Sequence, residues 1–246
     1  MEALYVNYIG PLKQYLMNDC LGGPRPTLFR YLINVQKGCT GLYVLALMFY
    51  FDNWSWAAHI YLANHGIYGV IWLLKDMTVP DPVWQTNITI LSTLIAGTGL
   101  GLYWVAGYIV VAHRVEVSPT LGALCIAMNT LGSTLMLATD TQKFYTLKYK
   151  KGLISDGWLT WSRNTNYFGE MMIYLSFALL AKHWIPFAWL GFMWSIVFMT
   201  NMVYKDVSLR KKEGGAEYFA KAGFLVPNLV GWAKTFSSDP KRAKVA

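Results

Sequence analysis

Charged side chains are scarce in this chain: they make up 14% of its 246 residues, whereas an ordinary soluble domain has about 25%. Hydrophobic residues account for 55% and aromatic residues for 16%. This composition excludes a disordered chain, because disordered chains are rich in charge and poor in large apolar residues. It also argues against a soluble fold of this length.

Cysteine and several catalytic motifs are also missing or rare. Cys20, Cys39 and Cys125 lie far apart, so they indicate neither a CxxC metal site nor a disulfide framework. The sequence contains no cluster of His, Cys and Asp at metal-ligand spacing, no GxGxxG, no phosphate-binding loop and no nucleophile elbow. We therefore expect no metal site, and no Rossmann or P-loop chemistry.

Long apolar segments are abundant instead. Residues 88–112 contain no Asp, Glu, Lys, Arg or His and exceed the roughly 20 residues that cross a bilayer core. Three further segments are nearly as apolar: 54–74, 121–139 and 185–204. A fifth, 166–181, contains one carboxylate, and a sixth, 38–51, is short and needs residues 32–37 to reach across. The sequence predicts an all-α transmembrane bundle of about six spans, with residues 1–31 forming an interfacial segment or a short seventh helix.

The basic residues agree with this count. With six spans, all but two of the 21 Lys and Arg residues fall on the side that holds both termini, and the exceptions are Arg114 and Lys182. Positive loops face the cytosol or its equivalent, so both termini are expected there. The basic excess is then an orientation signal and a surface for anionic lipid, and nucleic acid is not an expected partner.

One span contains a carboxylate. Glu170 follows Arg163 and Asn166 at a spacing that places all three on one helix face, next to Gly169, where a neighbouring backbone can approach closely. An ionisable residue inside a span is a functional candidate by default. The alternative is a structural clamp in which Glu170 pairs with Arg163 or with a lysine of a neighbouring helix.

A second polar face occurs in the predicted helix 54–74. Tyr61, His65, Tyr68 and Trp72 recur along one side of this helix. Tyr68 is a candidate proton donor, because a phenol remains protonated at neutral pH. The alternative for this face is helix packing, with the hydroxyl and imidazole groups satisfied across the interface.

Two segments of the C-terminal half carry a family resemblance. Residues 156–170, DGWLTWSRNTNYFGE, resemble the signature DGLW..SRHPNYFGE of the steroid 5-alpha-reductase C-terminal superfamily and its DUF1295 branch. Residues 206–218, DVSLRKKEGGAEY, followed by Phe224–Pro227, are similar to the closing element of that superfamily. The superfamily includes sterol reductases, and isoprenylcysteine carboxyl methyltransferases are more distant relatives.

The resemblance implies a membrane-embedded reductase that transfers a hydride from NADPH to a polarised C=C bond of a lipid, such as a steroid enone. It implies that Asn166 hydrogen-bonds the nicotinamide carboxamide and that Glu170 lies beside the nicotinamide and the substrate carbonyl. The other cofactor-binding residues that it implies are Asp140, Lys148, Lys151, Arg163 and Tyr167. On this view the chain divides into the interfacial segment 1–31, the N-terminal helices 32–139 and the cofactor-binding region 140–246 with its basic tail.

The chain also departs from the family pattern. Asn164 and Thr165 stand where the signature has His-Pro, and no histidine follows His183, whereas the steroid reductases have a histidine-rich segment after the last span. Two alternatives therefore remain: a catalytically silent subunit of a membrane complex, and an S-adenosylmethionine-dependent methyltransferase. The endoplasmic reticulum is the expected membrane, with the mitochondrial inner membrane as the alternative.

Overall fold

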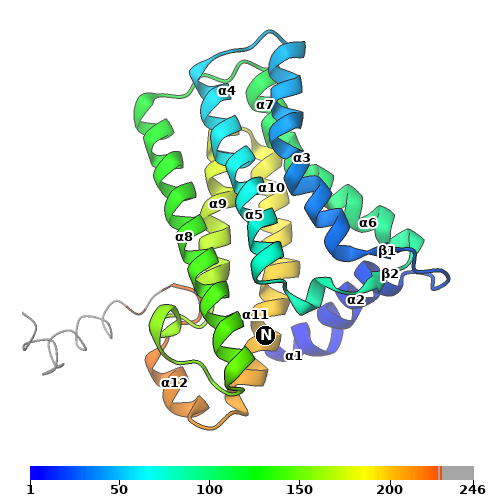
Figure 1. Cartoon of the computed structure of the whole chain (residues 1–246), viewed down its shortest axis with the longest axis vertical. Coiled ribbons are helices and arrows are strands. Elements are labelled where there is room, and N and C mark those ends of the chain that lie inside the picture. The colour runs from blue at the N-terminus through cyan, green and yellow to red at the C-terminus, as the bar shows by residue number, and fades with distance from the viewer. Residues whose placement is uncertain (227, 229–246) are drawn as a thin grey trace, which may run out of the picture.

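A computed structural model describes residues 1–226 and 228 of the chain. Six long helical segments dominate this region and form a bundle (Figure 1). They are α3 (Phe29–Tyr50); α4 (Trp56–Tyr61) continuing through the π-helical turn Leu62–Gly66 into α5 (Ile67–Thr78); α6 (Ile90–Gly101) continuing through the 3-10 turn Leu102–Trp104 into α7 (Val105–Ala112); α8 (Pro119–Tyr149); α9 (Thr165–Ala181); and α10 (Trp184–Met193) continuing through the π-helical turn Trp194–Phe198 into α11 (Met199–Arg210). The predicted basic tail and Pro227 lie outside the described residues.

Shorter elements connect and cover these helices. The N-terminal segment consists of α1 (Glu2–Leu4), a π-helical turn (Tyr5–Ile9), α2 (Gly10–Gln14) and a second π-helical turn (Tyr15–Asp19). Strand β1 (Thr27–Leu28) pairs antiparallel with β2 (Asn87–Ile88). The remaining elements are the 3-10 turns Pro82–Trp84 and Gly157–Leu159 and the helix α12 (Gly215–Lys221).

The predicted membrane bundle is confirmed. Within the described residues, four helices are long and apolar enough to cross a membrane: α3, Ile90–Ala112, α8 and Trp184–Arg210. The other two predicted spans are also helical, since 54–74 falls almost entirely within Trp56–Thr78 and 166–181 corresponds to α9. The chain is therefore an integral membrane protein, and the count of six spans and the side of its termini stay predictions.

Local sequence signals set where the helices begin. The side chains of Ser55, Thr89 and Ser118 accept hydrogen bonds from backbone N–H groups in the first turns of α4, α6 and α8. Pro119 occupies the first position of α8, where its missing N–H costs nothing.

Arg114 and Lys182, the two cations that the charge pattern assigns to the side opposite the termini, lie at one end of the bundle. Arg114 donates from its guanidinium to the carbonyls of Phe51 and Asp52, at 2.8 and 3.0 Å, and Lys182 donates to the carbonyl of Glu116 at 3.2 Å. The loops that follow α3, α7 and α9 are thus tied together at the end of the bundle drawn uppermost in Figure 1.

Helices α8 and α9 approach each other closely near the predicted site. A Cβ atom on Gly132 would lie 2.5 Å from the carbonyl oxygen of Gly169, and a Cβ atom on Gly169 would lie 2.5 Å from the carbonyl oxygen of Gly132. Close approach through small residues is a common way for membrane helices to associate. The predicted close approach at Gly169 is confirmed.

This contact can be tested by adding one methyl group. We expect Gly132→Ala to push α9 away from α8 and to lower the free energy of unfolding by about 1 to 3 kcal/mol, measured as a lower melting temperature in detergent. Gly191→Ala on α10 is the matched control, because no atom lies within 4 Å of the added Cβ. Equal melting temperatures for the two variants would contradict the packing argument.

Candidate functional site

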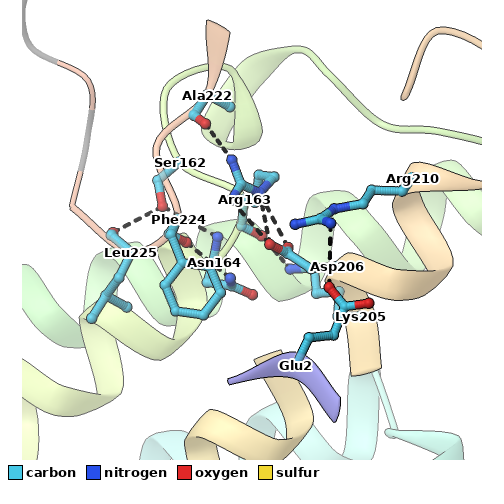
Figure 2. Close-up of polar contacts among 10 residues, drawn as sticks. All are labelled: Glu2, Ser162, Arg163, Asn164, Lys205, Asp206, Arg210, Ala222, Phe224 and Leu225. Carbon is cyan, nitrogen blue, oxygen red and sulfur yellow. Dashed lines mark hydrogen bonds and ion pairs between the residues drawn. The ribbon is translucent and has the colours of Figure 1, made fainter. Parts of the chain in front are cut away.

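A buried ion pair holds the turn that precedes α9. Arg163 donates from Nε and Nη2 to the carboxylate of Asp206 on α11, at 3.0 to 3.2 Å, and from Nη1 to the carbonyl of Ala222 at 2.5 Å (Figure 2). The guanidinium also stacks over the ring of Phe219, 4.1 Å from its centre. The side chains of both ionic partners are less than 10% exposed. Each of the three guanidinium nitrogens therefore donates a hydrogen bond within the protein.

Hydrogen bonds around this pair join the two segments that carry the family resemblance. Ser162 donates to the carbonyl of Leu225 and Asn164 to that of Phe224, both at 2.9 Å (Figure 2). Tyr218 donates to the carbonyl of Leu159 at 2.7 Å, and burial raises the pKa of Tyr218 to about 12, which keeps this donor protonated. The signature 156–170 and the closing element are thus one structural unit.

The structure corrects the predicted role of Arg163. This residue does not share a helix face with Asn166 and Glu170, because α9 begins at Thr165 and the backbone of Asn164 is non-helical, with φ −127° and ψ 40°. The alternative in which Arg163 pairs with Glu170 is also wrong, since Asp206 is its partner. Arg163 therefore positions the start of α9.

Asn166 and Glu170 lie one turn apart on α9. Each has a polar side-chain group without a hydrogen-bond partner in the described part of the chain. The Oδ1 atom of Asn166 is buried and has no hydrogen-bond partner among the described residues. The carboxylate of Glu170 lines a cavity and forms no ion pair or hydrogen bond within the described part of the chain, and it feels Lys75 and Lys37 only at longer range. A buried polar atom without a partner is costly, so both groups are suited to a ligand.

Asp140 and the nearby Gln142 make mainly structural contacts. Asp140 forms an ion pair with Lys75 that joins α8 to α5. Gln142 accepts from the backbone N–H of Trp158 at 2.8 Å and donates to the carbonyl of Asp156 at 3.0 Å. The intervening Gly157 has φ +54°, and a Cβ atom there would lie 2.6 Å from the Gln142 amide. These contacts explain the glycine of the signature.

A small basic cavity of about 180 Å³ lies beside the Arg163–Asp206 pair. Lys143, Lys205, Lys212 and Arg163 line it, together with Tyr218. Lys205 donates to the carbonyl of Arg163, and Lys212 donates to the carbonyl of Gly152 at 2.7 Å. Sequence reasoning missed these three lysines, although Lys143 directly follows the Asp140–Gln142 motif.

The predicted phosphate ligands Lys148 and Lys151 do not line this cavity. Both side chains are exposed: Lys148 lies in the last turn of α8, and Lys151 follows the end of that helix. Tyr167 also does not line this cavity, and its ring lies 5.3 Å from that of Phe198. The structure therefore does not bring these three predicted residues together with the basic cavity.

Glu170 lines a larger apolar cavity of about 420 Å³. The N-terminal segment, α3, α6, α9 and α10 contribute to its wall, and the polar groups in the wall include Lys13, Gln36, Lys37, Glu170 and Tyr174. Its aromatic lining includes Trp72, Trp84, Trp189, Phe192 and Phe198. The volume lies within the range of about 300 to 1,000 Å³ that is usual for small-molecule sites.

The predicted proton donor Tyr68 lies behind this cavity. Its side chain is fully buried and does not line the wall, and its hydroxyl contacts Lys37 Nζ at 3.0 Å and Tyr174 Oη at 3.2 Å. Tyr61 and His65 hydrogen-bond each other at 2.8 Å within one helix. Tyr174 and Lys37, which sequence reasoning did not single out as ligand-binding groups, face the cavity in place of Tyr68.

The fold and the two cavities define a polytopic helical membrane protein with a polar site at the start of α9. The chain matches the family described as "Protein of unknown function (DUF1295)" over residues 99–223 and belongs to that family, which is part of the steroid 5-alpha-reductase-like superfamily. No curated protein and no solved structure matches the chain. The matched region contains every predicted site residue except Tyr68.

The buried ion pair can be tested by removing one charge. We expect Asp206→Asn to lower the free energy of unfolding by roughly 3 to 5 kcal/mol, because Arg163 would remain buried without a carboxylate. Glu2→Gln is the control, since it removes the carboxylate of an exposed ion pair with Arg210, and such pairs contribute about 0 to 1 kcal/mol. Melting temperatures in detergent report both effects, and similar small shifts would contradict the assigned role of Asp206.

Proposed function

We propose that the protein is a membrane-embedded NADPH-dependent reductase that acts on a C=C bond conjugated to a carbonyl group in a lipid-like molecule. One observation carries this proposal: a single short segment, the turn before α9 and the first turns of α9, contributes to the walls of both a basic cavity and an apolar cavity. Arg163 lines the basic cavity, Glu170 lines the apolar cavity, and the unmatched Asn166 lies between them in sequence.

The basic side of the site fits the cofactor. A dinucleotide phosphate carries about three to four negative charges, and lysine ammonium groups bind phosphate as point charges. Lys143, Lys205 and Lys212 supply these charges, and no carboxylate lines their cavity. Its volume of about 180 Å³ suits phosphate groups rather than a whole nucleotide.

The side-chain oxygen of Asn166 on α9 is a suitable hydrogen-bond acceptor for the nicotinamide end of the cofactor. The buried Oδ1 of Asn166 lacks a donor, and the amide N–H of a nicotinamide carboxamide is a donor of the right type. When bound, NADPH supplies the hydride. Asn166 would orient its nicotinamide ring toward the apolar cavity.

Glu170 is the group best placed to handle the proton. Reduction of a conjugated C=C bond adds a hydride to one carbon and a proton to the other, so the site needs an acid or a proton relay. The Glu170 carboxyl lines the cavity and is not used in any ion pair with the described residues. The aromatic wall of the cavity would bind the apolar body of the substrate and exclude water.

Cofactor binding by the purified protein in lipid nanodiscs tests the basic cavity. We expect NADPH to bind and Lys212→Met to weaken its affinity about tenfold, because a charge-assisted contact to phosphate is lost. Lys148→Met removes the same charge outside the cavity and should leave the affinity within twofold.

Other outcomes of this titration decide between the alternatives. If neither NADPH nor S-adenosylmethionine binds, the chain is a silent subunit, and co-purification of membrane partners would support that function. If S-adenosylmethionine binds in place of NADPH, the protein is a methyltransferase. Imaging of the tagged chain would test the proposed location in the endoplasmic reticulum against the mitochondrial inner membrane.

The proposed role of Glu170 predicts a separation of turnover from cofactor affinity. Glu170→Gln keeps the size and polarity of the side chain but cannot donate a proton. We expect turnover of an enone, followed by NADPH oxidation, to fall by about 10²-fold or more, while the dissociation constant of NADPH changes less than threefold. Glu116→Gln at the opposite end of the bundle is the control, and equal losses of turnover and affinity would make Glu170 a scaffold residue.

A further inference from the structure

A row of polar side chains follows the side of α8 that is buried against α4 and α5. Asn129 and Ser133 lie between Gly122 and Asp140, and successive members are separated by seven, four and seven residues, a spacing that keeps all four on one helix face. The end members show what this face contacts: a Cβ atom on Gly122 would lie 2.9 Å from a side-chain atom of α4, and Asp140 pairs with Lys75 of α5. Asn129 and Ser133 therefore face α4 and α5 as well.

Asn64 faces this row from the neighbouring helix. It lies in the π-helical turn Leu62–Gly66 that joins α4 to α5, four residues after Ile60, which contacts α8 at Gly122. Residues four apart share a helix face, so Asn64 is also directed toward α8. Single π-helical turns within α-helices are frequent at functional sites.

Helix α9 encloses the same space, next to α5 and α8 (Figure 1). Helix α5 contacts α9 through the hydroxyl groups of Tyr68 and Tyr174, which lie 3.2 Å apart. Glu170 precedes Tyr174 by one turn and so lies on the same side of α9, toward α5. Ser133 and Glu170 each directly follow a glycine of the close α8–α9 contact. Glu170, which lines the apolar cavity, is therefore at the level of the polar row.

The polar side chains around this space lack partners. The Nδ2 atoms of Asn64 and Asn129 and the Oγ atom of Ser133 are buried and have no hydrogen-bond partner among the described residues. All three residues are only 7% exposed. Buried polar groups are normally satisfied by protein or by ordered water, and a buried water typically makes about three hydrogen bonds. Several unpaired groups around one space therefore match the needs of ordered water.

We propose that Asn64, Asn129 and Ser133 bind a chain of ordered water between α5, α8 and α9, and that this chain connects Glu170 with the Lys75–Asp140 pair. The Asp140 side chain is 16% exposed and lies toward the basic end of α8, which makes it the end of the chain nearest the solution. The water site stands without the proposed reductase function, whereas its use as a proton path rests on that function.

The water chain would return the proton that each turnover consumes. The aromatic wall of the apolar cavity keeps bulk water from that side of Glu170. Glu170 gives its proton to the second carbon of the C=C bond, and the adjacent water then gives one of its protons to the carboxylate. Each water is reprotonated by the next, until a proton enters from solution beside Asp140. One proton is taken up for each proton delivered, and no group of the path is oxidised or reduced.

Radiolytic labelling tests the water site without an assay of function. X-ray pulses split bound water into hydroxyl radicals, which oxidise an adjacent methionine to its sulfoxide. Met136 is the reporter, because it is 0% exposed and lies on α8 between Ser133 and Asp140. Met48, which is 0% exposed in the last turn of α3, is the control. In nanodiscs we expect Met136 to be oxidised about tenfold faster than Met48.

Two variants and a matched control assign the water to the polar row. Asn129→Leu keeps the approximate size of the side chain, and Ser133→Ala removes one hydroxyl group. Each should slow the oxidation of Met136 about threefold or more, because the water loses a ligand. Thr134→Val is the control, since Thr134 is exposed on the same helix and donates to the carbonyl of Thr130 at 2.9 Å. Should Asn129→Leu not fold, Ser133→Ala still decides the result.

The proton path predicts a difference between the first turnover and later ones. On this view Glu170 is protonated before the first turnover and needs the water chain only afterwards. We expect Ser133→Ala to leave the rate of the first turnover of an enone within twofold and to slow steady-state turnover about fivefold or more, so that NADPH oxidation shows a burst. Thr134→Val should show no new burst. A structural defect would slow both phases equally.

The contrary outcomes are distinct. Oxidation of Met136 no faster than that of Met48, or unchanged in both variants, would overturn the water site. Steady-state turnover that is unchanged, or that slows together with the first turnover, would overturn the proton path. Fast oxidation of Met136 that depends on Ser133, in a protein that binds no NADPH, would support the water site and reject the proton path together with the reductase.

Discussion

The buried pair of Arg163 and Asp206 is the interaction on which the rest of the site depends. It joins three pieces of chain that are distant in sequence: the turn before α9, the helix α11 and the segment after α12 that contains Ala222 (Figure 2). A guanidinium buried in this way holds its partners firmly, because separating them leaves an uncompensated charge. The pair therefore fixes where α9 begins, and Asn166 and Glu170 lie one turn apart near that starting point.

Most polar groups near the site are satisfied, and this makes the exceptions informative. Lys75 pairs with Asp140, and Asp76 accepts from Arg30 and Asn34 at 2.7 to 3.1 Å. Lipid offers no partner for a polar group, so such pairs allow these helices to remain in the membrane. The groups left without such a partner in the described part of the chain include Asn166 Oδ1, the Glu170 carboxylate, Gln36 Nε2 and Trp189 Nε1. The last three belong to residues that line the apolar cavity.

The sequence predicts the elements of this fold better than the partners within it. Apolar runs place the helices, and a carboxylate inside a span marks Glu170, because both signals depend on local composition. The face that contains Tyr68 is also predictable, but its hydroxyl turns out to lie behind the cavity. Helical spacing identifies the residues that share a face, whereas the neighbour that each residue meets depends on how helices pack.

The dependence on helix packing also explains why the predicted phosphate-binding lysines differ from the lysines that line the basic cavity. Lys148 and Lys151 follow the family pattern near the end of α8 but do not line the basic cavity, whereas Lys205 and Lys212 line it from α11 and the turn after it. In the sequence Lys37 is one of many basic residues near a helix end, because the excess of positive charge hides a single buried cation. Only its contacts with Gly69, Tyr68 and Tyr174 distinguish it from an orientation signal.

The two cavities differ in which part of the chain builds them. The lining of the basic cavity falls entirely within the region that matches the family, residues 99–223. The apolar cavity combines Glu170 and Tyr174 from that region with Lys37 and Trp72 from outside it and with the N-terminal segment, which Lys13 ties to Asn201. The basic cavity is thus built from the family region alone, whereas the apolar cavity combines that region with the N-terminal half of this chain. Substitutions in α3, α5 and the segment before them can therefore reshape one wall of the apolar cavity while Arg163, Asp206 and the three lysines stay in place.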